Sequence, residues 1–364
     1  MQISELAKAG CSVWLDDLSR AKLTGSDAHS LPPRIKNSGV VGVTTNPAIF
    51  KAAISDATEY SADIAALSGK SVEEVITKLT TDDVRIACDL FTDIYRTSNG
   101  FDGRVSIEVD PRSAHDTAAT VREGKALWQI IARPNVLIKV PATLAGLPAI
   151  TELIGAGVSV NVTLIFSIER YSQVIEAYIA GIELADKNGV DLTQIHSVAS
   201  FFISRLDTAI DPILKADGGV LAHSLLGAAA IANAHLAYEK FEQEFAADHW
   251  NLLAAKGANV QRPLWASTGV KDPAYDDTRY VLELVAPNTV NTMPQSTLDA
   301  VIDHGVFKGN SIAGKYEEAR IVFTQLAELG ISIDKVTADL ESDGVKKFAD
   351  AWIELLASVK GAMA

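Results

Sequence analysis

Short apolar runs alternate with longer amphipathic stretches along this chain. Most of the runs are rich in β-branched and aromatic residues and lack strict polar alternation, which is typical of parallel strands covered on both faces. Eight runs of this kind occur, at residues 11–16, 39–46, 104–110, 135–141, 158–166, 196–203, 262–268 and 281–290. We therefore predict eight strands.

The stretches between the runs have a helical period. One apolar stripe is formed by Val84, Cys88, Phe91 and Tyr95, at the spacing of a single helix face. Ser71 precedes Glu74 by three residues, as in a capping box, and Pro148 stands where the first turn of another helix is expected. Helices are therefore predicted between the strands.

Strand alternating with helix eight times predicts an α/β fold, a single (β/α)8 TIM barrel. A doubly wound open sheet is the rival architecture, but no GxGxxG follows the first predicted strand. Two helical additions are expected, an insertion at residues 211–260 before the seventh strand and a C-terminal tail at 344–363. No Pro/Gly/Ser-rich linker isolates either, so residues 1–364 are predicted to form one domain.

Composition and charge exclude several classes of protein. The chain has 364 residues, 48% of them hydrophobic, and a net charge of -14 without a basic stripe, so nucleic acid is not expected as a partner. Two cysteines in a chain of this length indicate a reducing, cytoplasmic location. No secretory signal or membrane-spanning stretch is found. The seven histidines show no metal-binding spacing, so neither a metal nor another cofactor is predicted.

Polar residues stand at the ends of several predicted strands, where barrel enzymes carry their catalytic groups. Because strand side chains alternate, Asn161 and Thr163 share one face, and so do Glu108 and Asp110. The full set of such residues is Asp16, Asp17, Thr44, Thr45, Asn46, Glu108, Asp110, Lys139, Asn161, Thr163, Ser200, Arg205 and Ser267. If these faces point inward, one small volume collects an amine, carboxylates, carboxamides and hydroxyls.

Lys139 lies within the apolar run "VLIKVP". Burial disfavours a charged amine, and a neutral amine attacks carbonyls to form a Schiff base, which then accepts electrons from a breaking C–C bond. Glu108 could assist the loss of water, and Asp16 could take a proton from a substrate hydroxyl. Asn46, Asn161 and Thr163 would orient hydroxyls and a water molecule.

Structural roles account for the same residues. A lysine in an apolar strand is often paired with a carboxylate or extends to the rim, and Glu108 could be its ion-pair partner. Asp16 or Asp17 could cap a helix, and residues 44–47 could form a turn. Asn161 and Thr163 could be a polar pair satisfied inside the barrel, and Arg205 could lie on a helix surface. Residue types alone leave both interpretations open.

Two segments point to an anion site. Arg205 follows Ser200 by five residues in "SFFISRLD", and "ASTGVKDP" places Ser267, Gly269 and Lys271 in a turn after the seventh strand. Loops after the seventh and eighth strands of barrels frequently bind phosphate. An ordinary turn with an exposed lysine is the alternative.

Together these motifs resemble the transaldolase family. "VTTNPAIF", "SIEVD", "VLIKVPAT", "VNVTLIF" and "SFFISRLD" occur in the family's order from about Ser12 to the C-terminus, and "SVWLDDLSR" and "WASTGVKDP" resemble its longer branch. The resemblance implies a cofactor-free (β/α)8 barrel of the pentose phosphate pathway. Such enzymes transfer a dihydroxyacetone unit from sedoheptulose 7-phosphate to glyceraldehyde 3-phosphate, giving erythrose 4-phosphate and fructose 6-phosphate.

The resemblance also implies roles for individual residues. The Schiff-base lysine corresponds to Lys139, the proton-transferring aspartate to Asp16, with Asp17 as second choice, and the water-activating glutamate to Glu108. The orienting residues correspond to Asn46, Asn161 and Thr163, the substrate serine to Ser200, and the phosphate ligands to Arg205 and Ser267.

One position departs from the family pattern. Much of the family has an arginine where Gly269 stands, and we expect Lys271 to supply that charge from further along the turn. Two other functions stay open: an aldolase that releases dihydroxyacetone, and a barrel that binds sugar phosphate without covalent chemistry. A homo-oligomer is compatible with the sequence.

Overall fold

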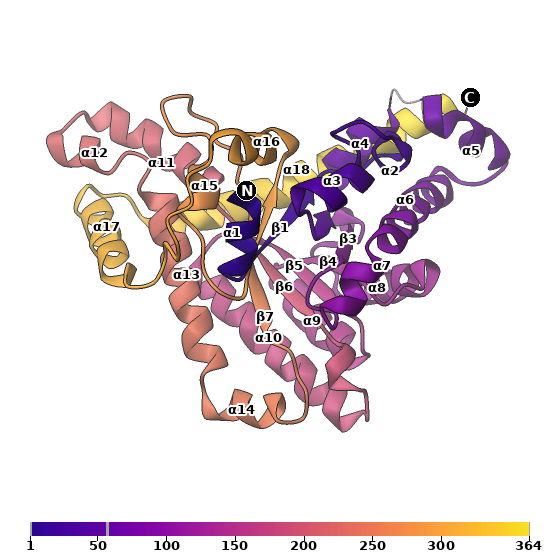
Figure 1. Cartoon of the computed structure of the whole chain (residues 1–364), viewed down its shortest axis with the longest axis horizontal. Coiled ribbons are helices and arrows are strands. Elements are labelled where there is room, and N and C mark those ends of the chain that lie inside the picture. The colour runs from indigo at the N-terminus through magenta and orange to yellow at the C-terminus, as the bar shows by residue number, and fades with distance from the viewer. Residues whose placement is uncertain (1, 56–57, 364) are drawn as a thin grey trace.

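The computed structural model describes residues 2–55 and 58–363. Eight parallel strands close into one barrel in chain order, with the eighth pairing back to the first (Figure 1). The strands are β1 (Cys11–Asp16), β2 (Gly42–Thr44), β3 (Arg104–Glu108), β4 (Val136–Pro141), β5 (Val160–Ile165), β6 (Ser197–Phe202), β7 (Gln261–Ala266) and β8 (Thr289–Met293). The (β/α)8 prediction is therefore confirmed.

Helices surround the barrel and connect its strands. The first half contains α1 (Gln2–Lys8), α2 (Arg20–Thr24), α3 (Leu31–Ser38), α4 (Pro47–Ile54), η1 (Thr58–Tyr60), α5 (Ser61–Ala66), α6 (Val72–Leu90), α7 (Thr92–Thr97), η2 (Pro111–Ser113), α8 (Thr117–Ile131) and α9 (Gly146–Gly155). The second half contains α10 (Ile168–Lys187), η3 (Leu192–Gln194), α11 (Ser204–Asp217), α12 (Val220–Ser224), α13 (Ala229–Phe245), α14 (Asp248–Ala254), α15 (Arg279–Leu282), α16 (Gln295–His304), α17 (Tyr316–Glu328) and α18 (Ile333–Ala362).

Local sequence signals set the helix boundaries. Ser71 and Glu74 form the reciprocal hydrogen bonds of the predicted capping box at the start of α6. Ser167 caps α10 by accepting a hydrogen bond from the backbone of Arg170. Pro148 lies in the first turn of α9, as predicted.

The predicted position of the eighth strand is wrong. Residues 279–282 form the short helix α15, and the strand begins at Thr289 and runs to Met293. The apolar run at 281–290 is buried because α15 and the following segment pack against the barrel. A short apolar run does not distinguish a buried strand from a buried helical turn.

The two helical additions are present. Helices α11 to α14 lie between β6 and β7, and α13 packs against α10, α17 and β7. Helix α18 contacts α4, α6, α11 and β5, and Figure 1 shows it as the long yellow helix that passes the strands and α4 and ends beside α5. The tail is therefore one continuous helix that connects distant parts of the barrel wall.

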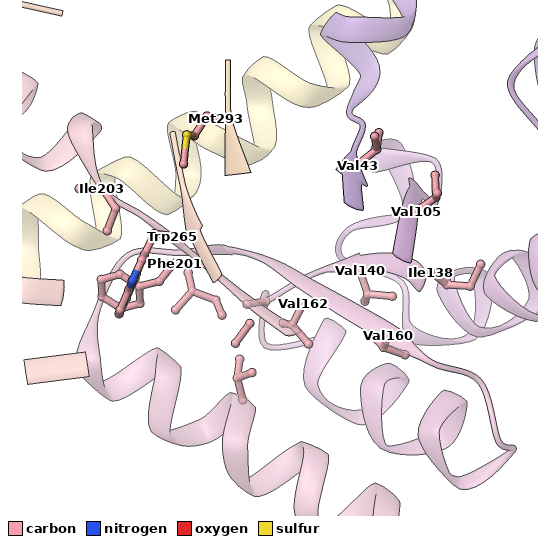
Figure 2. Close-up of a cluster of buried hydrophobic side chains, with 14 of the residues drawn as sticks. Val43, Val105, Ile138, Val140, Val160, Val162, Phe201, Ile203, Trp265 and Met293 are labelled. Carbon is pink, nitrogen blue, oxygen red and sulfur yellow. The ribbon is translucent and has the colours of Figure 1, made fainter. Parts of the chain in front are cut away.

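Alternate residues of each strand face opposite sides of the barrel wall. Ile138 and Val140 belong to the apolar layer between strands and helices (Figure 2), and a Cβ at Gly124 of α8 would lie 3.4 Å from Ile138. Lys139 lies between them in β4 and therefore points into the barrel. The inward direction explains why Lys139 carries an amine although both of its neighbours in the strand are buried and apolar.

A second apolar cluster fills the inside of the barrel. Trp14, Leu137, Val198, Leu264 and Val290 belong to it, and all are buried. A Cβ at Gly42 would lie 2.6 Å from the Trp14 indole, so this strand position requires glycine. This apolar cluster separates the space at the amino ends of the strands from the space at their carboxyl ends.

No helix in the described ranges is both long and apolar enough to cross a membrane.

Candidate active site

A pocket of about 130 Å³ opens at the carboxyl ends of the strands. Most of the predicted site residues line it, and Glu108, Asn161 and Thr163 are buried beside it. Its polar lining comes from Asp16, Thr44, Asn46, Lys139, Ser200, Arg205, Ser267, Lys271 and Thr292, and aromatic rings come from Phe202 and Phe348. Residues far apart in the sequence therefore meet at one barrel end.

Lys139 is 4% exposed and reaches the pocket from β4. Its Nζ atom donates a hydrogen bond to the backbone oxygen of Thr45 at 3.1 Å and lies 3.2 Å from Oε2 of Glu108. Glu108 and Asn161 flank Lys139 in register on the neighbouring strands. The predicted ion pair exists, but it lies at the pocket, so the amine keeps access to a substrate.

Glu108 is buried, with 6% of its surface exposed. Burial raises its pKa to about 7, against the opposing effect of the nearby Lys139 ammonium. Within the described ranges, neither carboxylate oxygen has an aligned hydrogen bond, and the Oγ1 atom of Thr163 also has no partner. Buried polar atoms normally have partners, so these atoms are suited to hold a water molecule or a substrate hydroxyl.

The two adjacent aspartates have different surroundings. Asp16 lines the pocket, and its Oδ1 atom accepts a hydrogen bond from Thr44 at 2.6 Å. Burial raises the pKa of Asp16, and the Lys139 ammonium opposes that shift. Asp17 instead forms an ion pair with Lys22. The structure therefore places Asp16 in the site and Asp17 outside it.

Hydrogen bonds fix the orienting residues. Ser200 donates to Oδ1 of Asn161 at 2.7 Å, and Asn161 donates to Ser106 at 2.9 Å. Asn161 is thus held by the hydroxyl groups of Ser106 and Ser200. Asn46 caps α4 through the backbone of Ile49 and also lines the pocket, so residues 44–47 form the end of β2 and the start of a helix rather than a simple turn.

Cations gather at one side of the pocket. Arg205 lies over the ring of Phe202 at 5.0 Å, and its Nη1 atom has no hydrogen-bond partner within the described ranges. Burial lowers the pKa of Arg205. Ser267 contacts Ser204 through its hydroxyl at 3.1 Å, and the exposed Lys271 also lines the pocket. These groups match the donors that bind a phosphate.

The turn after β7 shows how Lys271 relates to Gly269. A Cβ at Gly269 would lie 3.7 Å from the Nζ atom of Lys271. The lysine amine therefore occupies space next to the position where much of the family carries an arginine side chain. This geometry fits the predicted compensation.

Comparison with known proteins identifies the relatives of this chain. The family model described as Transaldolase/Fructose-6-phosphate aldolase matches residues 13–359. The chain is 57% identical to the transaldolase of Renibacterium salmoninarum over 99% of this chain and 96% of that protein. It belongs to the transaldolase/fructose-6-phosphate aldolase family. Transaldolase 1 of Streptomyces coelicolor is 56% identical over 98% of this chain and 93% of that protein. The transaldolase of Mycolicibacterium smegmatis is 54% identical over 99% and 96%.

Two residues that line the pocket, Thr292 and Phe348, are not among the site residues predicted from the sequence. Thr292 contacts the Thr44 hydroxyl at 2.6 Å and so connects β8 to Asp16. It was missed because the eighth strand was predicted too early in the chain. Phe348 of α18 lies 5.3 Å from the Lys139 amine, and only the path of α18 across the barrel brings it there.

Asp110 does not join the site, although it alternates with Glu108. Its carboxylate caps η2 and pairs with Arg112. The strand ends at Glu108, so the two-residue alternation no longer applies beyond it. In the residues that the structure describes, no group of three or more His, Cys, Asp or Glu side chains could hold a metal ion.

Proposed function

We propose that this protein is a transaldolase, which transfers a dihydroxyacetone unit from sedoheptulose 7-phosphate to glyceraldehyde 3-phosphate. Erythrose 4-phosphate and fructose 6-phosphate are the products, as in the pentose phosphate pathway. The observation that carries the proposal is the buried Lys139 amine at a pocket that is also lined by Asp16, Arg205 and Lys271. Full-length relatives named transaldolase support it.

The first step joins the donor ketose to the enzyme. Glu108 takes a proton from the Lys139 ammonium at 3.2 Å, and the neutral Nζ atom then attacks the C2 carbonyl carbon. The resulting carbinolamine loses its hydroxyl as water after accepting that proton back from Glu108. A protonated imine remains. A carboxyl group with a pKa near 7 can both donate this proton and later take one from water during hydrolysis.

The second step breaks the C3–C4 bond. The Asp16 carboxylate takes the proton of the C4 hydroxyl, and the bonding electrons move toward the imine nitrogen to give an enamine. Carbon C4 becomes the aldehyde of erythrose 4-phosphate. Enamine attack on glyceraldehyde 3-phosphate reverses these movements, with Asp16 returning its proton to the new hydroxyl. Hydrolysis then releases fructose 6-phosphate.

The remaining residues position the substrates in this proposal. Arg205, Ser267 and Lys271 bind the terminal phosphate, and Asn46, Asn161 and Ser200 orient the sugar hydroxyls. Thr163 and Glu108 hold the water that enters and leaves. We also propose a cytoplasmic location, which is supported by the two free, buried cysteines, Cys11 and Cys88.

The test compares product formation with and without the acceptor aldehyde. With fructose 6-phosphate and erythrose 4-phosphate as substrates, a transaldolase forms sedoheptulose 7-phosphate quickly and releases little free dihydroxyacetone. Rapid release of dihydroxyacetone without an acceptor would instead assign the aldolase activity that the family description also names. Failure to convert either substrate set would reject both.

A further inference from the structure

A second cavity, of about 240 Å³, lies at the amino ends of the strands. Arg104 is the first residue of β3, Ser197 begins β6, and Arg262 is the second residue of β7; all three line this cavity. The first pocket is lined from the opposite strand ends. The apolar side chains of Trp14, Leu137 and Val198 lie between the two regions.

Two buried arginines dominate this second cavity. Arg104 is 1% exposed and Arg262 is 4% exposed. Arg104 donates through Nε to the backbone oxygen of Gly100 and through Nη1 to that of Pro134. Its Nη2 atom and the Nε atom of Arg262 are buried without a hydrogen-bond partner among the described residues. Two donor groups therefore remain free at the cavity.

The charge of this cluster is not balanced. Arg262 pairs with Asp102 at 3.3 Å, and Asp102 also accepts hydrogen bonds from Ser12 and Trp14. Within the described ranges Arg104 has no carboxylate partner, although the Tyr95 ring lies 5.1 Å from its guanidinium. A buried, uncompensated guanidinium is unfavourable. An anion in the cavity would satisfy both its charge and its free donors.

His196 and Gly100 shape the space beside Arg104. A Cβ at Gly100 would lie 2.8 Å from Nε2 of His196 and 2.9 Å from Nη2 of Arg104, so glycine keeps the gap between them open. Burial and the two arginines lower the pKa of His196 to about 3, and its neutral ring can donate a hydrogen bond at pH 7. A neighbouring hollow of about 360 Å³ is also lined by His196, and the exposed Arg96 is another of its lining residues.

We propose that this cavity is a second anion site, which binds a phosphate group between Arg104, Arg262 and His196. The guanidinium fork matches phosphate oxygens better than a spherical ion such as chloride. The ligand is inorganic phosphate or a small phosphate ester, and the two share the group that is recognised. The site is independent of the reaction assigned to the other end of the barrel.

The test uses histidine NMR as a local reporter. None of the residues lining the active-site pocket is a histidine, so the ring resonance of His196 reports on the second cavity and the hollow beside it, and not on the active-site pocket. The full-length protein is titrated at pH 7.5 with inorganic phosphate and, separately, with glycerol 3-phosphate, which has no carbonyl for Lys139 to attack. Potassium chloride at equal ionic strength is the control. A saturable shift is expected with one or both phosphates and not with chloride.

Variants separate the two sites. Arg205→Ala, at the active-site pocket, should leave the His196 shift unchanged. Arg104→Gln keeps a donor but removes the charge, and it should weaken binding by about tenfold or more, the loss expected for a charge-assisted hydrogen bond. Arg96→Ala removes a positive charge from an exposed residue of the hollow that shares His196 with the cavity, and it should weaken phosphate binding without affecting folding.

The outcomes decide whether Arg104 and Arg262 bind phosphate or are only solvated by water in the cavity. A shift with only one of the two phosphates supports the site and assigns its ligand. No His196 shift with either phosphate would overturn the proposal, and so would a shift that is the same in wild type, Arg104→Gln and Arg96→Ala. Because the reporter does not depend on turnover, these results are distinct from any failure of the transaldolase assignment.

Discussion

Two adjacent aspartates have different contacts because Asp16 is the last residue of the first strand and Asp17 lies beyond it. Asp16 accepts a hydrogen bond from Thr44 inside the pocket, whereas Asp17 pairs with Lys22 outside it. The sequence "WLDD" predicted that one of the two belongs to the site but could not select between them from residue type. The last inward-facing position of β1 makes the selection.

Asp16→Asn and Asp17→Asn form a matched pair of variants. Asp16→Asn removes the base for the C4 hydroxyl, so kcat for dihydroxyacetone transfer should fall by about 100-fold or more. Imine formation at Lys139, measured by borohydride trapping, should persist. Asp17→Asn should keep nearly full activity. Equal losses in both variants would contradict the assignment of Asp16.

Glu108 makes the imine-forming step pH dependent. Its raised pKa, about 7, means that the carboxyl is largely protonated below pH 7 and loses its proton as the pH rises through that value. Donation of a proton to the leaving hydroxyl therefore weakens above pH 7. In single-turnover experiments, the wild type should form the imine faster than Glu108→Gln, with the largest ratio of rates below pH 7. A ratio independent of pH between 5 and 9 would argue against this role.

Strand alternation indicates which residues lie at the pocket, but it does not indicate pocket residues that come from distant segments. Lys139, Glu108 and Asn161 are in register on three neighbouring strands, so their types and spacing were informative. Thr292 and Phe348 reach the pocket from elements whose placement required the complete fold. No local pattern in the sequence distinguishes Phe348 from the other apolar residues of its helix.

At the scale of elements, α18 forms part of the active-site wall. Phe348 lines the pocket near the Lys139 amine. A Cβ added at Gly344 would lie 3.0 Å from Leu164 and 3.5 Å from Arg205, so the helix packs closely against the barrel at this glycine. An enamine must survive until the acceptor arrives, so water has to be excluded. The helix is placed to exclude it.

Phe348→Ala should open the pocket to water. The rate of free dihydroxyacetone release should rise relative to the rate of transfer, because the enamine is protonated before an acceptor binds. Ile353→Ala, on the exposed side of the same helix, is the control and should leave this ratio unchanged. The ratio is measured by following both products from fructose 6-phosphate with and without erythrose 4-phosphate. An unchanged ratio in Phe348→Ala would remove α18 from the mechanism.

The eighth strand shows the limit of prediction for elements. Seven strands were predicted near their observed positions. In residues 281–290 the apolar character arises from burial of a short helix and the segment after it. A short apolar run therefore predicts that a segment is buried, but it does not predict that the segment is a strand.

At the scale of the whole molecule, we propose that the chain is one domain. Helix α18 contacts α4 and α6 from the first half of the barrel and α11 and α17 from the second, so its packing depends on both halves. Thermal unfolding followed by near-ultraviolet and far-ultraviolet circular dichroism should therefore give coincident, single transitions. Two separated transitions would indicate that the helical insertion or the tail unfolds independently.

The account depends most on covalent capture of the ketose by Lys139. The direct measurement is treatment with fructose 6-phosphate and borohydride, followed by mass spectrometry of the whole protein and of its peptides. We predict one stable adduct, located on Lys139, that is retained in Lys271→Met and absent from Lys139→Met. An adduct located on another lysine, or rapid turnover by Lys139→Met, would contradict the mechanism.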